Sequence, residues 1–208
     1  MNKKIYFLVI ASLILLTSLS QAQNRHIKAG DNAFEAQLYR EAAERYKKGY
    51  KKLDAKEDKI AVSFKMAECY RLTNELRKAK AQYKRLIRYE FDKDKPEIIL
   101  RYGQVLLMLE EFEEADLQFT IYDSIMGEDP QAKMAIESIK FARRAYNNPK
   151  NYTIENIKKI NSKFDDFSPS YQDNNYQSIY FTSTREEAFG KDIDGWTGED
   201  FSDLFYAK

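Results

Sequence analysis

Side chains able to carry out catalysis are few in this sequence. His26 is its one histidine and Cys69 its one cysteine, so His-based triads and multi-histidine metal sites are not supported. Cys69 stands beside Ala67 and Tyr70 in a helical pattern, which predicts a buried thiol. The sequence therefore predicts a protein that is not an enzyme and that holds no cofactor and no metal.

Two acidic segments could be mistaken for binding sites. The motif Asp192-x-Asp194-Gly195 shares its first two acids with a calcium loop, but the third acidic ligand and the closing glutamate are absent. A hairpin turn is the better interpretation. The four glutamates within residues 110–114 fit a solvated face between a helix and a turn.

A spaced pattern of small and aromatic residues is the strongest signal in the chain. Residues 39–46, 76–83 and 112–119 each read large apolar, two polar, alanine, three residues, aromatic. The shared alanines are Ala42, Ala79 and Ala115, which are 37 and 36 residues apart. The residues 12 positions before these alanines are small as well: Gly30, Ala67 and Gly103.

This spacing has a physical meaning in paired helices. Two helices approach closely where one offers Gly or Ala, and an aromatic residue fills the adjoining groove. The pattern resembles the tetratricopeptide repeat over roughly residues 24–127, although it lacks the tryptophan of that repeat. We expect helices at 24–37, 40–54, 58–73, 76–90, 96–109, 112–126 and 131–146. The last of them would cap the array.

Stacked hairpins of this kind expose a concave groove lined by the first helix of each pair. Five side chains are expected on its solvent face, and they are our candidate contacts for a protein or peptide partner: Asp31, Glu35, Glu68, Arg71 and Gln104. An ordinary solvated surface is the alternative for each of them.

The N-terminus has the three parts of a secretory signal. Lys3 and Lys4 precede an apolar run at 5–16, and Ser20-Gln21-Ala22 supplies the small residues of a cleavage site. We expect residues 1–22 to be removed and the mature chain to be exported without a membrane span. A membrane anchor is the alternative, but the apolar run is short for that role.

The sequence pattern changes after the helical region, which we place at 23–146. A polar linker at 147–153 contains Pro149, and short runs of aromatic and β-branched residues follow. Strands are expected at 178–184 and 203–207, with Ile179 and Phe181 on one face. The segment 164–171 should turn into a further strand.

The segment 154–208 resembles part of a WD40-like propeller repeat of the TolB type. A blade needs four strands and a propeller about four blades, so we expect the chain to be a truncated piece of a longer protein. The fold class is then mainly α: three tetratricopeptide-type hairpins with a capping helix, followed by an incomplete propeller blade.

This order of parts resembles exported envelope proteins of the Bacteroidetes, in which blades precede an OmpA-like domain. The resemblance implies a periplasmic protein that is associated with the outer membrane and contacts peptidoglycan through a missing C-terminal domain. Some members of that family serve gliding motility or type IX secretion. The expected function is a protein–protein scaffold of the envelope. Two alternatives stay open: an accessory region of an exported serine-peptidase-type hydrolase, and a glycan- or peptide-binding module for uptake.

The charge balance argues against one further class of partner. The formal net charge is +1, and removal of Lys3 and Lys4 with the signal peptide changes it to −1. Nucleic-acid binding would need a basic excess on one face. No nucleic-acid partner is therefore expected.

Overall fold

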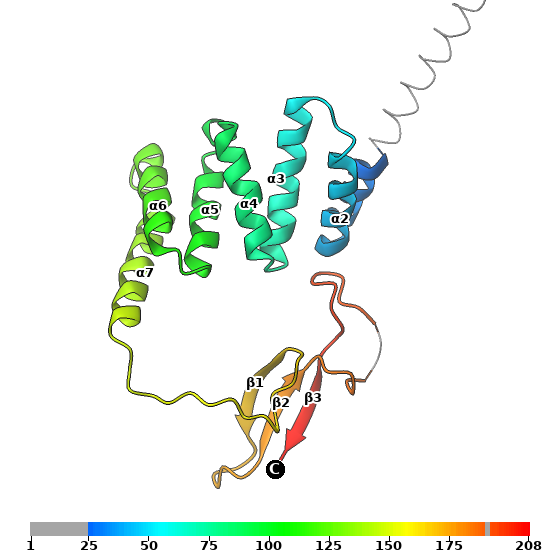
Figure 1. The fold of residues 1–208 in the computed structure, drawn as a ribbon, viewed down its shortest axis with the longest axis vertical. Coiled ribbons are helices and arrows are strands. Elements are labelled where there is room, and N and C mark those ends of the chain that lie inside the picture. Colours follow the sequence, from blue (N-terminus) through cyan, green and yellow to red (C-terminus); the bar gives the residue numbers. More distant parts are fainter. Residues whose placement is uncertain (1–24, 190–191) are drawn as a thin grey trace, which may run out of the picture. The chain divides into compact units, whose positions relative to one another are not determined.

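The computed structural model describes residues 25–189 and 192–208, so the predicted signal peptide 1–22 lies outside the described residues. The chain divides into two compact units, and the boundary falls between Pro149 and Lys150. The first unit is helical and the second contains a small sheet (Figure 1).

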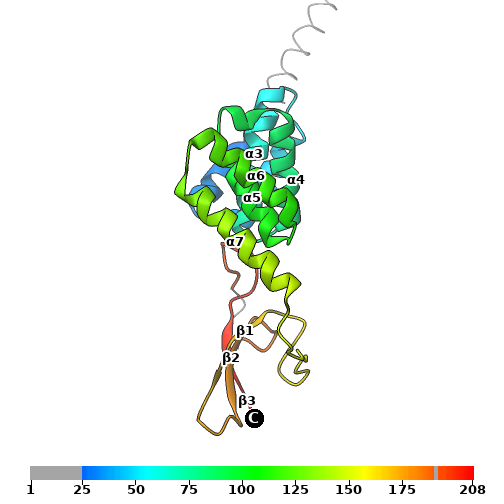
Figure 2. The same cartoon turned by 90° about the vertical axis from the view of Figure 1, so that its left-hand side faces the viewer.

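Stacked helices make up the first unit (Figures 1 and 2). Residues 25–35 are helical, and they are followed by α2 (Tyr39–Tyr50), α3 (Lys56–Leu72), α4 (Leu76–Arg88), the 3-10 helix η1 (Phe91–Lys93), α5 (Glu97–Met108), α6 (Phe112–Met126) and α7 (Pro130–Asn147). Each expected helix is present. The helix expected at 76–90 is α4, which ends at Arg88, and beyond it Glu90 adopts a left-handed conformation (φ 59°) that leads into η1.

The turn inside each hairpin passes through one left-handed residue. Gln37, Asn74 and Glu110 have φ values of 61°, 57° and 61°. Residues other than glycine and asparagine rarely adopt this backbone conformation. It nevertheless recurs here at the same interval as the small-residue pattern. The three hairpins therefore share the same backbone conformation at the turn between their two helices.

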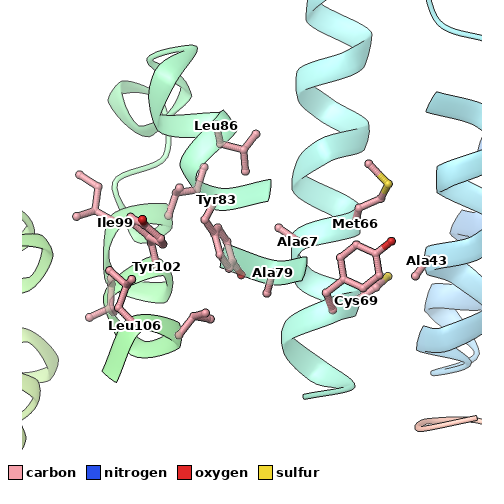
Figure 3. Close-up of a cluster of buried hydrophobic side chains, with 14 of the residues drawn as sticks. Ala43, Met66, Ala67, Cys69, Ala79, Tyr83, Leu86, Ile99, Tyr102 and Leu106 are labelled. Carbon is pink, nitrogen blue, oxygen red and sulfur yellow. The ribbon is translucent and has the colours of Figure 1, made fainter. Parts of the chain in front are cut away.

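Close helix crossings occur at the small residues. A Cβ added to Gly30 would lie 2.6 Å from the Tyr46 ring, and one added to Gly103 would lie 2.5 Å from the Phe119 ring. In the second hairpin Ala67, Ala79 and Tyr83 are all fully buried between α3 and α4 (Figure 3). The aromatic ring of each second helix therefore fills the space that the small residue leaves open.

Helix α7 covers α6 at the end of the array that faces the reader in Figure 2. Asp129 caps its N-terminus and accepts hydrogen bonds from the backbone N–H groups of Gln131 and Ala132. Ala132 and Ile139 are buried, whereas Met134 and Phe141 on the outer side are more than half exposed.

The second unit contains a three-stranded antiparallel sheet in the order β1 (Asp166–Tyr171), β2 (Ile179–Ser183) and β3 (Asp203–Ala207). Along β2, Phe181 is buried and Tyr180 is exposed, as the predicted alternation requires. The Arg185 guanidinium lies 4.8 Å from the Phe181 ring and 4.9 Å from the Phe205 ring. A small sheet is therefore present, and its assignment to a propeller blade stays a prediction.

The acidic segment near residue 194 is a turn, as predicted. Ile193 and Asp200 form an isolated antiparallel bridge. The Asp194 carboxylate accepts hydrogen bonds from the backbone N–H groups of Trp196 and Thr197 and from the Thr197 hydroxyl. These hydrogen bonds lower the pKa of Asp194, the one from Trp196 most. Its carboxylate oxygens thus stabilise the turn.

Candidate functional site

A cavity of about 560 Å³ opens on the side of the array formed by the first helices of the hairpins. Its walls come from residues 25–35, α2, α3 and the segment around η1. The lining residues are Asp31, Phe34, Glu35, Tyr46, Ala61, Phe64, Lys65, Glu68, Phe91 and Lys95. Three of the five candidate contact residues, Asp31, Glu35 and Glu68, therefore line one cavity.

Asp31 is held by contacts inside the protein. The Tyr46 hydroxyl donates to Asp31 Oδ1 at 2.7 Å, and Lys65 Nζ lies 2.5 Å from the same oxygen. Burial, followed by the hydrogen bond to Asp31, raises the pKa of Tyr46 well above its ordinary value, so the phenol stays protonated as a donor. Asp31 thus connects its own helix to α2 and to α3.

Glu68 is the centre of a second and more buried cluster. It is only 7% exposed and accepts hydrogen bonds from the Tyr83 hydroxyl and from Arg71 Nη2, while Arg101 pairs with the same carboxylate. Burial by itself would raise the pKa of Glu68. Hydrogen bonds from Arg101, Tyr83 and Arg71 outweigh burial and hold the pKa below its ordinary value. The carboxylate is therefore ionised and fully engaged.

These two clusters follow a rule that repeats along the array. Asp31 and Glu68 each come directly after the small residue of a first helix, and Lys65 and Arg101 each stand two residues before the small residue of the next first helix. We call this series of ion pairs the ladder. Because each pair joins successive first helices, the ladder ties one hairpin to the next.

The third hairpin departs from the rule. Gln104 occupies the position after Gly103 and is exposed, and Phe119 has no hydroxyl to donate. Here Tyr102 on the first helix donates to Glu114 on the second at 2.7 Å. Gln104 does not line the cavity, so the structure separates it from the other candidate residues.

The expectation of a solvent-facing Glu68 differs from the structure, because Tyr83, Arg71 and Arg101 cover its carboxylate. Arg71 is a partner of Glu68 and does not itself line the cavity. Burial acts to lower the pKa of Arg71, but Glu68 raises it overall. Sequence spacing could not reveal that side chains from α3, α4 and α5 cover the Glu68 carboxylate.

Two charged side chains in the cavity wall have no ion pair within the part of the chain that the structure describes. Glu35 is exposed, and Lys95 Nζ lies 4.8 Å above the Phe64 ring. Phe64 also meets Phe91 edge to face, with ring centroids 6.2 Å apart. Phe34, by contrast, packs edge to face on Tyr39 at 5.1 Å. The cavity thus offers an aromatic wall with one carboxylate and one ammonium group that are not engaged in ion pairs among the described residues.

Residue spacing did not identify four further residues that line the cavity, namely Phe34, Phe64, Phe91 and Lys95. The first two could have been found, because they stand on the candidate face of helices already assigned. Phe91 and Lys95 lie in the connection between hairpins, where no repeat pattern exists. Their position depends on the turn at Glu90, which the sequence did not reveal.

Other chemistry is sparse among residues 25–189 and 192–208. No group of three or more metal-binding side chains comes together there, and burial, with a smaller contribution from Glu68, raises the pKa of the Cys69 thiol to about 12. A thiol with so high a pKa is a poor nucleophile. Over the same residues, no helix combines the length and apolar character that a membrane crossing requires.

No protein-family model and no curated protein matches this chain. Similar solved structures include yeast Tom70, which is 18% identical in sequence with a TM-score of 0.51. The match covers 62% of this chain and 25% of the Tom70 chain. The C-terminal TPR-containing domain of a Plasmodium falciparum FK506-binding protein is 16% identical with a TM-score of 0.51, over 62% of this chain and 94% of that one.

A third solved structure is the first TPR of Spaghetti (RPAP3) bound to the HSP90 peptide SRMEEVD. It is 19% identical with a TM-score of 0.49, over 60% of this chain and 95% of that one. The chain corresponds to about a quarter of Tom70. At identities this low a likeness concerns the fold alone. The helical unit of this chain has a tetratricopeptide-type fold.

Proposed function

We propose that the helical unit is a scaffold that binds an extended segment of a partner protein along the face formed by its first helices. The observation that carries this proposal is the cavity, where an aromatic wall lies beside two charges without ion pairs. Binding sites for small or extended ligands combine an apolar wall with a few fixed polar groups in this way.

The ion pairs inside the protein limit which cavity side chains can pair with a charged group of the ligand. Asp31 and Glu68 are neutralised by neighbouring helices, so ligand charges would meet Glu35 and Lys95. A partner segment with an aromatic or long aliphatic side chain next to an acidic residue fits best. The apolar side chain would enter the cavity while its acidic neighbour pairs with Lys95.

The cellular setting belongs to the same proposal and rests on the sequence. The predicted signal peptide 1–22 supports export, and the resemblance to envelope proteins supports a place in the periplasm near the outer membrane. There the scaffold would join partner proteins to the envelope, and the same resemblance supports peptidoglycan as a further contact. N-terminal sequencing of the periplasmic fraction should find a chain that begins at Gln23, and an intact Met1 in the membrane fraction would contradict export.

Peptide binding can be tested with acetylated, fluorescein-labelled nonapeptides that carry a central Phe flanked by either Asp or Lys. Fluorescence anisotropy should show that the chain prefers the Asp-flanked peptide. Ala61 lies in the cavity wall, so Ala61→Trp should block the cavity and weaken binding at least about tenfold. Ala145→Trp on exposed α7 is the matched control.

A charge reversal sharpens the same test. Lys95→Glu should shift the preference from the Asp-flanked to the Lys-flanked peptide, because the sign of the free charge beside the aromatic wall changes. Equal binding of both peptides by every variant, or equal losses in Ala61→Trp and Ala145→Trp, would contradict a site in this cavity.

A further inference from the structure

Helices α4 and α6 have opposite charges although they occupy equivalent places in successive hairpins. Within α4 there are six basic residues and no acidic one: Arg77, Lys78, Lys80, Lys84, Arg85 and Arg88. Within α6 there are four acidic residues and no basic one: Glu113, Glu114, Asp116 and Asp123. Solubility alone does not explain why equivalent helices carry charges of opposite sign.

The exposed members of these two sets lie on the outer side of the array, and they are Arg77, Lys78, Lys84 and Arg88 on α4 and Glu113 on α6. Ala79 and Ala115 are equivalent and fully buried, so the opposite sides of both helices point away from the core. On that side of α6 runs an exposed apolar row in which Leu117 is 56%, Ile121 36% and Ile125 52% exposed. At the positions equivalent to Leu117 and Ile121, α4 has Ala81 and Arg85, and α2 has Glu44 and Lys48. The apolar row is thus particular to the third hairpin.

We propose that this outer face binds a second copy of the chain, with α4 of each copy lying along α6 of the other. A two-fold axis parallel to the helices and midway between α4 and α6 produces both contacts at once, so the dimer is closed. Each residue of α4 then faces the residue at the equivalent position of the partner's α6. Arg77 faces the partner's Glu113, and Ala81 leaves room for the partner's Leu117.

Charge complementarity selects this occupant and this arrangement. A two-fold axis perpendicular to the helices would place α4 against α4 and α6 against α6, which sets bases against bases and acids against acids. In the proposed arrangement the aliphatic stems of the α4 side chains cover the apolar row. Lys84 and Arg88 are the exposed bases level with that row.

The facing charges are available for such a contact. Arg77 is exposed and makes no ion pair within the residues that the structure describes. Glu113 reaches Arg143 only at 3.7 Å, and its side chain is 89% exposed. Both groups can therefore pair with a second copy without breaking a strong contact inside the first.

Sedimentation velocity on the chain beginning at Gln23, between about 1 and 200 µM, tests the proposal. We expect a monomer–dimer equilibrium that weakens as salt is raised, because the facing charges are solvent-accessible. Leu117→Glu should abolish the dimer. Met134→Glu makes the same change at another exposed apolar site, on the outer side of α7, and should leave the dimer intact.

Paired charge reversals identify the contact itself. Arg77→Glu and Glu113→Arg should each weaken dimerisation at least about tenfold, and the double variant should return to within about threefold of the original chain. Thermal unfolding followed by circular dichroism checks that each variant is folded. A chain that is monomeric throughout the concentration range, equal effects of Leu117→Glu and Met134→Glu, or a double variant without recovery would each overturn the proposal.

Discussion

In the first two hairpins a tyrosine on the second helix donates to a carboxylate on the first helix, and a base from the next hairpin pairs with the same carboxylate. In the third hairpin the direction is reversed, because Tyr102 on the first helix donates to Glu114 on the second. All three hairpins share the small-residue crossing and the left-handed turn.

This difference separates two tasks that a repeat must perform. The crossing of a small residue with an aromatic ring closes one hairpin, and its form is common to all three. The ladder joins one hairpin to the next, so it is needed only where another hairpin of the same kind follows. The polar residues on the inner face are therefore set by neighbouring hairpins, and only the remaining ones, such as Glu35, are free for partners.

The largest expected effect comes from removing the centre of the ladder. Glu68→Ala leaves Arg101, Arg71 and Tyr83 without their shared acceptor, and loss of one partner of a buried pair costs about 3–5 kcal/mol of unfolding free energy. Gln104→Ala removes the equivalent side chain of the third hairpin and should change stability by less than about 0.5 kcal/mol. Urea denaturation measures both, and similar losses would remove the distinction between the hairpins.

The second prediction concerns the crossing that the hairpins share. Ala79 is fully buried where α4 crosses α3, so Ala79→Leu should overpack the crossing and cost about 1–3 kcal/mol. Ala81 is exposed on the same helix, and Ala81→Leu should stay within about 0.5 kcal/mol. Thermal unfolding at low protein concentration compares the two. A smaller loss for Ala79→Leu than for Ala81→Leu would mean that the repeat register is wrong.

A smaller effect should distinguish the first hairpin from the second. Tyr83→Phe removes a donor to the buried Glu68 carboxylate and should cost about 1.5–3 kcal/mol, as for a hydrogen bond to a charged group. Tyr46→Phe removes a donor to Asp31, whose side chain is 37% exposed, so water can replace the hydroxyl and the cost should be below about 1 kcal/mol. The reverse order would show that burial does not set the strength of these bonds.

The smallest expected effect is a dependence on pH. The pKa of Glu68 is lowered from 4.5 in the folded chain, so its contribution to stability is complete above the unfolded pKa and decreases as pH falls through the folded pKa. The stability difference between the original chain and Glu68→Gln should therefore shrink below pH 4.5. Denaturation at a series of pH values measures it, and a difference that grows in acid would contradict the assigned direction.

Much of the helical unit could be predicted because its pattern is local. The small residue, the alanine and the aromatic ring lie within one hairpin, so spacing alone places Gly30, Ala42 and Tyr46 at one crossing. The ladder depends on residues in different hairpins, and a carboxylate such as Glu68 reads as surface until its neighbours are placed. The sequence does contain a signal for it: Lys65 and Arg101 recur two residues before the small position.

The sheet unit was less predictable for a related reason. The strands follow from β-branched and aromatic alternation, and β2 and β3 appear where expected. The position of Arg185 beside the stacked rings of Phe181 and Phe205, with Asp166 Oδ1 2.5 Å away, requires the order of strands in space. That order comes from pairing across the sheet, which residue spacing does not determine.

The ladder also gives the array a direction of growth. A copy of the first or second hairpin brings both a base for the hairpin before it and an acid for the hairpin after it, so a duplicated copy could be inserted upstream of the third hairpin without loss of a pair. The third hairpin brings Arg101 but has Gln104 where the next pair would need an acid. Lengthening by gene duplication, in evolution or by engineering, is thus favoured before residue 96 and disfavoured after residue 126.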